Sequence, residues 1–372
     1  SAAVRNNSLV SGFISLGHTV DVYTIRFPAT RTSSFLNNGR LLFTELPGLS
    51  INNKINRSLK NFSWLLKIKV YLQNLIFFPD VYSRWLRLFR MSDFSMYDIL
   101  ISSSDNKISH LIAQKINIMY PDLRWIQIWG DPWYGDMSLS KLMKLRIKDK
   151  ERELLEKAYK VIYTSPLTRD MQVKLYPQFE DKLFHIPRSY FKHIKQSIIS
   201  SPDAINILYS GALDKGRNIS SFINAVKCFN ESHTKRVVIN VYGGYNQETY
   251  NYLSTFDFVH VNNVIDYNEM LDIYAESDVM LFIANPGITT QIPGKLYDYF
   301  GTDSLIICLV NDINDPVSNY LKKYSSKCLV IENEEENIKN AIDNIVNTAS
   351  IRCPALVDFS PSNIAKKVLE LL

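Results

Sequence analysis

Short apolar runs and amphipathic stretches alternate along this chain of 372 residues. In the first half, the apolar runs have the length of buried strands, and the stretches between them repeat apolar residues at helical spacing. This pattern predicts strands over 20–24, 99–102, 125–129 and 161–164, and helices over 2–16, 106–119 and 142–158. Such an alternation indicates a parallel sheet with helices on both faces. Because a doubly wound sheet normally begins with a strand, we expect further residues before Ser1.

The polar segment 193–204 interrupts this alternation with Ser-Ser-Pro, and we interpret it as a linker. Beyond it the alternation begins again. The pattern predicts strands over 206–210, 237–242, 279–283 and 304–310, and helices over 219–229 and 267–276. Ser360 and Pro361 predict the start of a last helix, because serine caps free N–H groups and proline fits the first helical position. We therefore expect two Rossmann-like domains, 1–192 and 203–359.

Composition narrows the class of protein. Hydrophobic residues make up 46% and charged residues 21% of the chain, an ordinary globular balance. The net charge of +5 suits an anionic ligand or membrane surface and is too weak to indicate nucleic acid. The four cysteines have no paired spacing, and histidines do not cluster with other metal ligands, so we expect no metal. The sequence shows neither a signal peptide nor a spanning apolar run, and a cytoplasmic location is expected.

The segment 291–301 combines features of an anion site. Pro293-Gly294 predicts a turn, and the helix that follows opens with Lys295. Unpaired N–H groups at a helix start, the helix dipole and a lysine together suit a diphosphate. Asp298, one turn later, can accept hydrogen bonds from sugar hydroxyls. The alternative is an ordinary turn before a helix, with a solvated lysine and a surface carboxylate.

Other candidate residues follow the ends of predicted strands. Gly211 comes after one strand, Gly243 and Gly244 come after the next, and Asp131 follows a strand of the first half. Glycines at such positions let a ligand approach the backbone closely. Because ligands of doubly wound sheets bind outside the carboxyl ends of the strands, these positions predict a nucleotide-sugar site.

Several motifs together resemble the GT-B glycosyltransferases, in particular glycosyltransferase family 4 enzymes of bacterial capsule and O-antigen assembly. The likeness runs nearly end to end, in matching order and spacing. The motifs are Gly17-His-Thr-Val, Ser102-Ser-Ser-Asp followed by His110-Leu, the segment 125–133 with Asp-Pro-Trp, Phe184-His-Ile-Pro187, the phosphate-loop-like 209–217, and the donor-helix-like 292–299.

The resemblance implies an α/β protein of GT-B fold, with two Rossmann-like doubly wound domains facing a central cleft. The N-terminal domain would bind the acceptor and the C-terminal domain the nucleotide sugar, with the last helix, 360–372, packing back onto the first domain. It also implies a retaining, metal-independent transfer that needs no cofactor.

Two departures from the family pattern concern the donor site. A pair of glutamates that many members carry corresponds here to Thr290 and Asp298, and the usual Gly-Arg of the phosphate loop is Gly211-Ala212. The cation of that loop must then come from residues a few positions later.

The resemblance implies a role for each matching position. Donor contacts are implied for Gly211, Lys215, Arg217, Gly243, Gly244, Thr289, Thr290, Gly294, Lys295, Leu296 and Asp298. Arg217 and Lys295 would stabilise the charge that grows on the departing diphosphate. Asp131 would orient or deprotonate the acceptor hydroxyl, between Trp129 and Trp133 stacking on sugar rings. The alternatives are solvated loop charges, a turn aspartate and tryptophans that pack the core.

The segment 57–90 mixes lysine and arginine with aromatic and aliphatic residues. Apolar faces flanked by basic residues suit an anionic membrane surface, here the inner face of the cytoplasmic membrane, although two domain helices with basic outer faces would give the same pattern.

The sequence thus predicts a glycosyltransferase of the hexosyltransferase type. It would move a sugar from a UDP- or GDP-sugar to a lipid-linked or oligosaccharide acceptor in surface polysaccharide synthesis. A GT-B nucleotide-sugar epimerase and a non-catalytic GT-B partner subunit are the alternatives.

Overall fold

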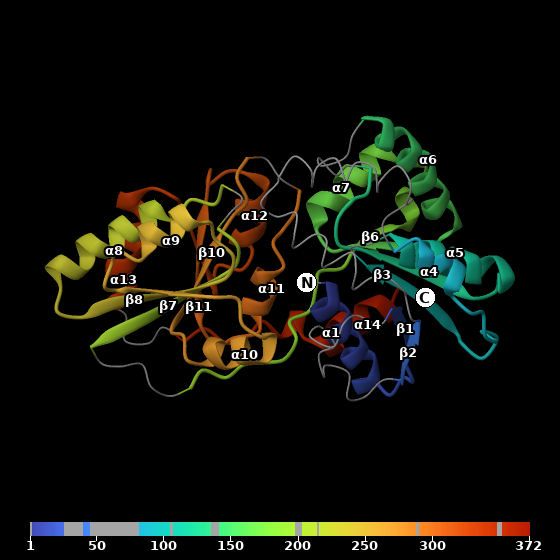
Figure 1. Ribbon diagram of the computed structural model, residues 1–372, viewed down its shortest axis with the longest axis horizontal. Helices are drawn as coiled ribbons and strands as arrows, with labels where there is room; N and C mark the ends of the chain where they lie inside the picture. The colour runs from blue at the N-terminus through green and yellow to red at the C-terminus, as the bar shows by residue number, and fades with distance from the viewer. Residues whose placement is uncertain are drawn as a thin grey trace. The chain divides into compact units, whose positions relative to one another are not determined.

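The computed structural model describes residues 2–25, 40–44, 82–104, 107–134, 141–197, 203–213, 216–287, 290–347 and 352–372. The chain forms two compact units (Figure 1). The first comprises Ser1–Pro187 together with Pro361–Leu372, and the second comprises Arg188–Ser360.

The division between the units precedes the segment that we expected to be the linker. Ile194 forms an isolated parallel bridge with Thr302, and its N–H donates to the Gly301 carbonyl at 2.8 Å. His193 Nε2 lies 2.7 Å from Asp303 Oδ1. Residues from Arg188 onward therefore belong to the second unit, because their backbone and side chains bind it.

The first unit holds a parallel sheet of order β3-β4-β5-β6 and a parallel pair, β1 with β2. Its elements are α1 (Ala2–Ser15), β1 (Asp21–Ile25), β2 (Arg40–Thr44), α4 (Arg84–Leu88), β3 (Ile99–Ser104), α5 (Ile108–Met119), β4 (Arg124–Trp129), α6 (Lys141–Lys157), β5 (Lys160–Tyr163), α7 (Pro166–Leu175), a 3-10 turn (Pro177–Lys182), β6 (Leu183–His185) and α14 (Pro361–Leu369).

The last helix, α14, completes the core of the first unit. Ile364 and Val368 are buried in one cluster with Leu9 and Phe13 of α1. The two helices lie so close that a Cβ built on Gly12 would come 2.1 Å from the carbonyl oxygen of Pro361. No side chain fits between them there, so a glycine is needed at this crossing.

The second unit is a six-stranded parallel sheet of order β12-β11-β10-β7-β8-β9. Its elements are β7 (Ala204–Ser210), α8 (Ser220–Ser232), β8 (Arg236–Tyr242), α9 (Gln247–Leu253), β9 (Val259–Asn262), α10 (Tyr267–Ala275), β10 (Val279–Ile283), α11 (Lys295–Phe300), β11 (Leu305–Val310), α12 (Pro316–Lys322), β12 (Cys328–Glu332), α13 (Glu335–Val346) and a 3-10 turn (Val357–Phe359).

The strand order reverses between β7 and β10, which is the arrangement of a doubly wound Rossmann sheet. Helices cover both faces: α8 and α13 lie on one side of this sheet and α10 on the other (Figure 1). Every residue of β10 is buried, as the apolar run 279–283 predicts. The predicted fold class, α/β with two Rossmann-like domains, is confirmed.

Candidate functional site

A pocket of about 270 Å³ lies in the second unit, at the carboxyl ends of β7, β8 and β9. Small-molecule sites typically measure about 300–1,000 Å³, so this pocket lies just below the lower end of that range. Three of the expected donor-site glycines line it, with Lys295. The lining residues are Ser210, Gly211, Ala212, Tyr242, Gly243, Gly244, Val264, Ile265, Tyr267, Met270 and Lys295.

The loops after β7 and β8 form one wall of the pocket. The Gly211 N–H donates to the Tyr242 carbonyl and the Leu213 N–H to the Gly244 carbonyl, each at 2.8 Å. A Cβ built on Gly243 would come 1.9 Å from the Gly211 carbonyl oxygen, and Gly243 has a φ of +153°. Glycine is therefore required at position 243 both by the space and by the backbone conformation.

A network of hydrogen-bonded hydroxyl groups holds the Lys295 amine. Lys295 Nζ donates to the Tyr274 hydroxyl at 3.3 Å, and that hydroxyl lies 3.1 Å from Ser210 Oγ. The Tyr299 hydroxyl also contacts Ser210 Oγ, at 3.0 Å, and accepts from the Ser210 N–H at 3.0 Å. These residues lie on β7, α10 and α11, so the network links the three elements next to the pocket. Sequence reasoning missed Ser210, Tyr274 and Tyr299, because their apolar surroundings suggest only core packing.

Asp298 is not the exposed carboxylate that its place on a short helix suggests. It is 6% exposed, and its Oδ1 accepts a 3.1 Å hydrogen bond from the Tyr267 hydroxyl, which lines the pocket. Burial and the Asp298 carboxylate raise the pKa of Tyr267, so the phenol remains a hydrogen-bond donor. Burial lowers the pKa of the Lys295 amine, and the carboxylate of Asp298 opposes this shift.

Arg217 connects the two loops at the point where the strand order reverses. Its Nη1 donates to the Ala212 carbonyl at 3.0 Å, and its Nη2 donates to Asn285 Oδ1 at 2.7 Å. Ala212 follows β7 and Asn285 follows β10. The guanidinium thus holds the pocket wall and is not itself among the lining residues.

Four further residues were expected to contact the donor: Lys215, Thr289, Thr290 and Leu296. Lys215 and Thr289 lie outside the described residues, and Thr290 is half-buried at the edge of the loop after β10. Leu296 was expected to contact the donor, but its side chain is fully buried and its N–H donates to the Pro293 carbonyl at 3.1 Å. Leu296 therefore stabilises the start of α11 instead of facing the pocket.

In the first unit, Trp129 does not offer a surface for a sugar ring, contrary to expectation. Its side chain is fully buried, stacked on His110 at 4.4 Å, and its Nε1 donates to Gln127 Oε1 at 2.9 Å. Trp133 is 6% exposed and packs in the same core. Asp131 is exposed between them, and its backbone carbonyl accepts a 2.9 Å hydrogen bond from Lys107 Nζ.

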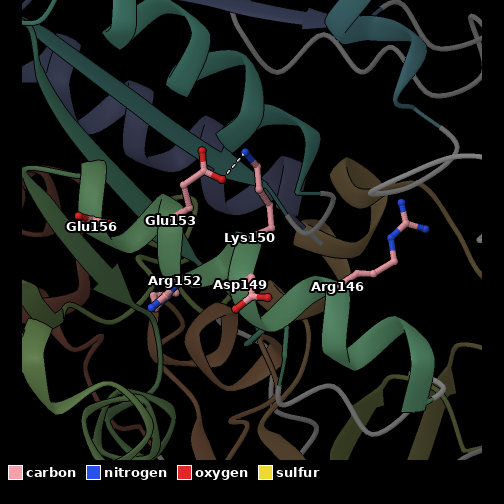
Figure 2. A pocket seen from close by; sticks show the side chains of 6 residues that line it. All are labelled: Arg146, Asp149, Lys150, Arg152, Glu153 and Glu156. Carbon is pink, nitrogen blue, oxygen red and sulfur yellow. Dashed lines mark hydrogen bonds and ion pairs between the residues drawn. The ribbon is translucent and has the colours of Figure 1, made fainter.

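A second hollow, of about 500 Å³, lies beside α6 in the first unit (Figure 2). Three basic and three acidic side chains of this one helix line it: Arg146, Asp149, Lys150, Arg152, Glu153 and Glu156. Lys150 and Glu153 form an ion pair at 2.8 Å, and both also bind Gln114 of α5. Spacings of three and four residues place such charges side by side on a solvated helix face, so we assign no ligand to this hollow.

The described residues contain neither a helix able to cross a membrane nor a group of three metal-ligating side chains. Most of the basic and aromatic segment 57–90 lies outside the described residues.

No protein-family model and no curated protein sequence matches the chain. Several solved structures are similar to the chain. A putative UDP-N-acetylglucosamine 2-epimerase from Listeria monocytogenes superposes with a TM-score of 0.56 at 10% identity, over 99% of this chain and 91% of that one. Sucrose-phosphate synthase from Thermosynechococcus elongatus gives 0.53 at 14% identity, over 98% and 87%. The N-terminal domain of Candida albicans trehalose-6-phosphate phosphatase gives 0.50 at 12%, over 95% of each. At these identities the likeness shows the fold, which is GT-B.

Proposed function

We propose that this chain is a glycosyltransferase that takes its sugar from a nucleotide-diphosphate donor. The pocket of the second unit carries the proposal, because its lining combines apolar and cationic side chains. Val264, Ile265 and Met270 supply apolar surface that suits a nucleobase, and Lys295 supplies a charge that suits a phosphate. The glycines after β7 and β8 let a ligand approach the backbone closely.

The chemistry of transfer fits these residues. As the bond from the sugar to the diphosphate breaks, negative charge grows on the leaving oxygen, and a fixed ammonium group stabilises that charge without reorganisation. Tyr274 and Ser210 hold the Lys295 amine in place. Arg217 acts in this proposal by fixing the pocket wall through Ala212 and Asn285. Asp298 would act on the ribose through Tyr267, which lies between it and the pocket.

Two similar structures support a nucleotide-sugar or sugar-phosphate substrate class through their names, a putative UDP-N-acetylglucosamine 2-epimerase and a sucrose-phosphate synthase. We further propose that transfer is retaining and metal-independent, that the donor is a UDP- or GDP-sugar, and that the acceptor is a lipid-linked saccharide of a bacterial surface polymer. A place on the inner face of the cytoplasmic membrane, through the segment 57–90, belongs to the same proposal.

Nucleotide binding tests the donor site directly. Thermal shift with UDP, GDP and their sugars should stabilise the second unit, by roughly 2.7 kcal/mol for a ligand at about 100 times its Kd. The Lys295→Met variant should lose most of this shift. Lys227→Met should keep it, because Lys227 is a surface residue of α8 paired with Glu231. If no nucleoside diphosphate or nucleotide sugar stabilises the wild-type protein, the proposal is wrong.

Epimerisation is the second candidate, favoured by the likeness to the putative 2-epimerase. Both reactions begin with the same substrate class, so binding alone does not separate them. Incubation of a bound nucleotide sugar without acceptor does. A transferase slowly releases nucleoside diphosphate to water, an epimerase produces a second nucleotide sugar with a new anomeric proton signal, and a non-catalytic partner subunit does neither.

A further inference from the structure

The side chain of Arg188 occupies the space that a side chain at position 294 would need. A Cβ built on Gly294 would come 1.7 Å from Arg188 Nη1 and 2.7 Å from its Cζ. Gly294 itself has ordinary helical angles, φ −60° and ψ −19°, so its backbone does not require glycine. A side chain at position 294 would therefore displace the guanidinium of Arg188.

The short segment that carries Arg188 is fixed along α11. A Cβ on Gly301, at the other end of this helix, would come 2.6 Å from Tyr190 Cγ. The Tyr190 N–H donates to the Phe359 carbonyl at 3.1 Å, and the Phe191 ring meets the edge of the Tyr267 ring at 5.8 Å. Tyr267 and Lys295 line the pocket, so the segment holds Arg188 next to two lining residues, although Arg188 is not itself among them.

The charges of Asp298 and Arg188 both act on the Lys295 amine, in opposite directions. Lys295 directly follows Gly294, on which the guanidinium lies. Burial lowers the pKa of the Lys295 amine, and the charge of Arg188 lowers it further. Two cations held together in a partly buried site repel each other, and an anion bound between them relieves that repulsion.

The phosphate loop does not supply an equivalent cation among the described residues. The usual arginine of that loop is replaced by Ala212, and Arg217 directs both Nη atoms to protein oxygens. Arg188 comes from a different part of the chain, and the planar shape of its guanidinium matches phosphate oxygens.

We propose that Arg188 is a donor-binding residue that, together with Lys295, holds the diphosphate of the nucleotide sugar, and that Gly294 is the space it requires. This inference rests on the proposed function, since it names a residue of the same site. Arg188, at the start of the second unit, would thus take the role that an arginine of the phosphate loop would otherwise have.

The test compares ligands that differ only in phosphate. Isothermal titration calorimetry measures the Kd of UDP and GDP, and of uridine and guanosine, for the wild type and three variants. Arg188→Gln removes the charge, Arg188→Lys keeps it without the fork, and Gly294→Ala keeps the arginine but displaces its guanidinium. We expect Arg188→Gln and Gly294→Ala to weaken the bound diphosphate at least about tenfold, the equivalent of about 1.4 kcal/mol, and to leave the nucleoside unchanged. Arg188→Lys should lie between.

Arg236→Gln is the matched control. Arg236 is exposed at the first residue of β8, opposite the carboxyl ends of the strands, and pairs with Asp257 at 3.1 Å. It should bind every ligand as the wild type does. If Arg188→Gln binds the diphosphates as tightly as the wild type does, this inference is wrong and the proposed function still stands. The same holds if Arg188→Gln loses affinity for nucleosides and diphosphates equally, because the role of Arg188 would then be structural. A wild type that binds neither UDP nor GDP overturns the proposed function and this inference with it.

Discussion

The backbone N–H of Tyr134 donates a 2.5 Å hydrogen bond to Oε2 of Glu151. Tyr134 directly follows the segment 129–133, which carries the acceptor-side candidates, and Glu151 lies in α6 with no exposed surface. Burial raises the pKa of Glu151 to about 7. The loop after β4 is therefore hydrogen-bonded to a carboxyl group that stays protonated to a higher pH than an ordinary glutamate does.

The surroundings of Glu151 explain why its ionisation is costly. Tyr163 of β5 and Gln172 of α7 are close to it, and both are fully buried. Among the described residues, the Tyr163 hydroxyl has no hydrogen-bond partner, and the side-chain hydrogen bond from Gln172 lowers the pKa of Glu151 only in part. The cationic group near it is Lys107, whose charge lowers the pKa only in part. Tyr176, at the end of α7, also faces this carboxyl.

Glu151→Gln should change how stability depends on pH. Because the folded-state pKa of about 7 exceeds the ordinary glutamate pKa of 4.5, the buried carboxyl contributes stability below pH 4.5 that is lost as the pH rises to 7. That loss amounts to about 3 kcal/mol, and glutamine, which stays neutral, should not show it. Urea unfolding followed by tryptophan fluorescence measures this in the first unit, since all five tryptophans lie between residues 64 and 133.

Glu153→Gln is the control on the same helix, because Glu153 is exposed and bound by Lys150, whose hydrogen bond lowers the pKa of Glu153. Glu153→Gln should change the pH dependence of the free energy of unfolding only slightly, and in the opposite direction. A difference between Glu151→Gln and wild type that stays constant from pH 4.5 to pH 8 would contradict the assignment of a raised pKa to this carboxyl.

Gly243→Ala should disrupt the wall of the nucleotide pocket. The new methyl group would overlap the Gly211 carbonyl, and the residue would also have to adopt a positive φ. We expect a loss of at least about 2–3 kcal/mol in the free energy of unfolding, together with loss of nucleotide binding. Gly287→Ala separates the two causes, since Gly287 has a φ of +72° and no atom within 4 Å of its ideal Cβ. It should cost only about 1 kcal/mol. Equal losses for the two variants would show that crowding against Gly211 contributes nothing.

Lys327→Met should destabilise the second unit. The Nζ of this fully buried lysine donates to the carbonyls of Thr302, Ser304, Cys353 and Pro354, at 2.6, 3.0, 2.8 and 3.3 Å. Methionine keeps the length of the side chain but leaves these oxygens without their donor. We expect a loss of about 2–4 kcal/mol, measured by urea unfolding followed by circular dichroism.

The matched control is Lys322→Met. Lys322 also donates to a backbone carbonyl, that of Ile313 at 2.6 Å, but in an exposed setting. It should cost less than about 1 kcal/mol. If both lysine variants cost the same, the four carbonyls do not depend on Lys327.

Asp131→Asn tests the acceptor side. The change keeps the size of the side chain and removes its charge, so transfer should fall at least about 100-fold if Asp131 acts as the base, while nucleotide affinity stays the same. The release of nucleoside diphosphate, with and without an extract of lipid-linked saccharides, measures the effect. Asp149→Asn, an exposed change on α6, should behave as wild type. An unchanged transfer rate in Asp131→Asn removes this residue from the mechanism.

Much of the fold could be predicted because it depends on local patterns. The run 279–283 is β10 with the predicted bounds, the helix predicted from Tyr267 begins at that residue, and the last helix begins at Pro361, where Ser360 and Pro361 indicate. Short apolar segments with capping signals fix such elements whatever packs against them. The helix α13 was not predicted, although its apolar positions have helical spacing.

The site could be predicted less well, because its details depend on contacts between distant parts of the chain. A turn does precede α11 at Gly294, as predicted, but the sequence does not show that the missing side chain of Gly294 makes room for Arg188. Trp129 suggests a sugar platform from its neighbours in sequence, but α5 brings His110 against its face. Nothing in the charged run of α6 distinguishes Glu151 from the exposed glutamates beside it.

The packing of α14 against α1 has a consequence for protein synthesis. A ribosome makes α1 before the second unit and α14 after it. Leu9 and Phe13 therefore lack their partners Ile364 and Val368 until the second unit has emerged. The second unit can fold during translation, whereas the first unit can close its core only after the second unit has been made. An apolar face of α1 is exposed throughout that interval, and chaperones that bind nascent chains would act on it.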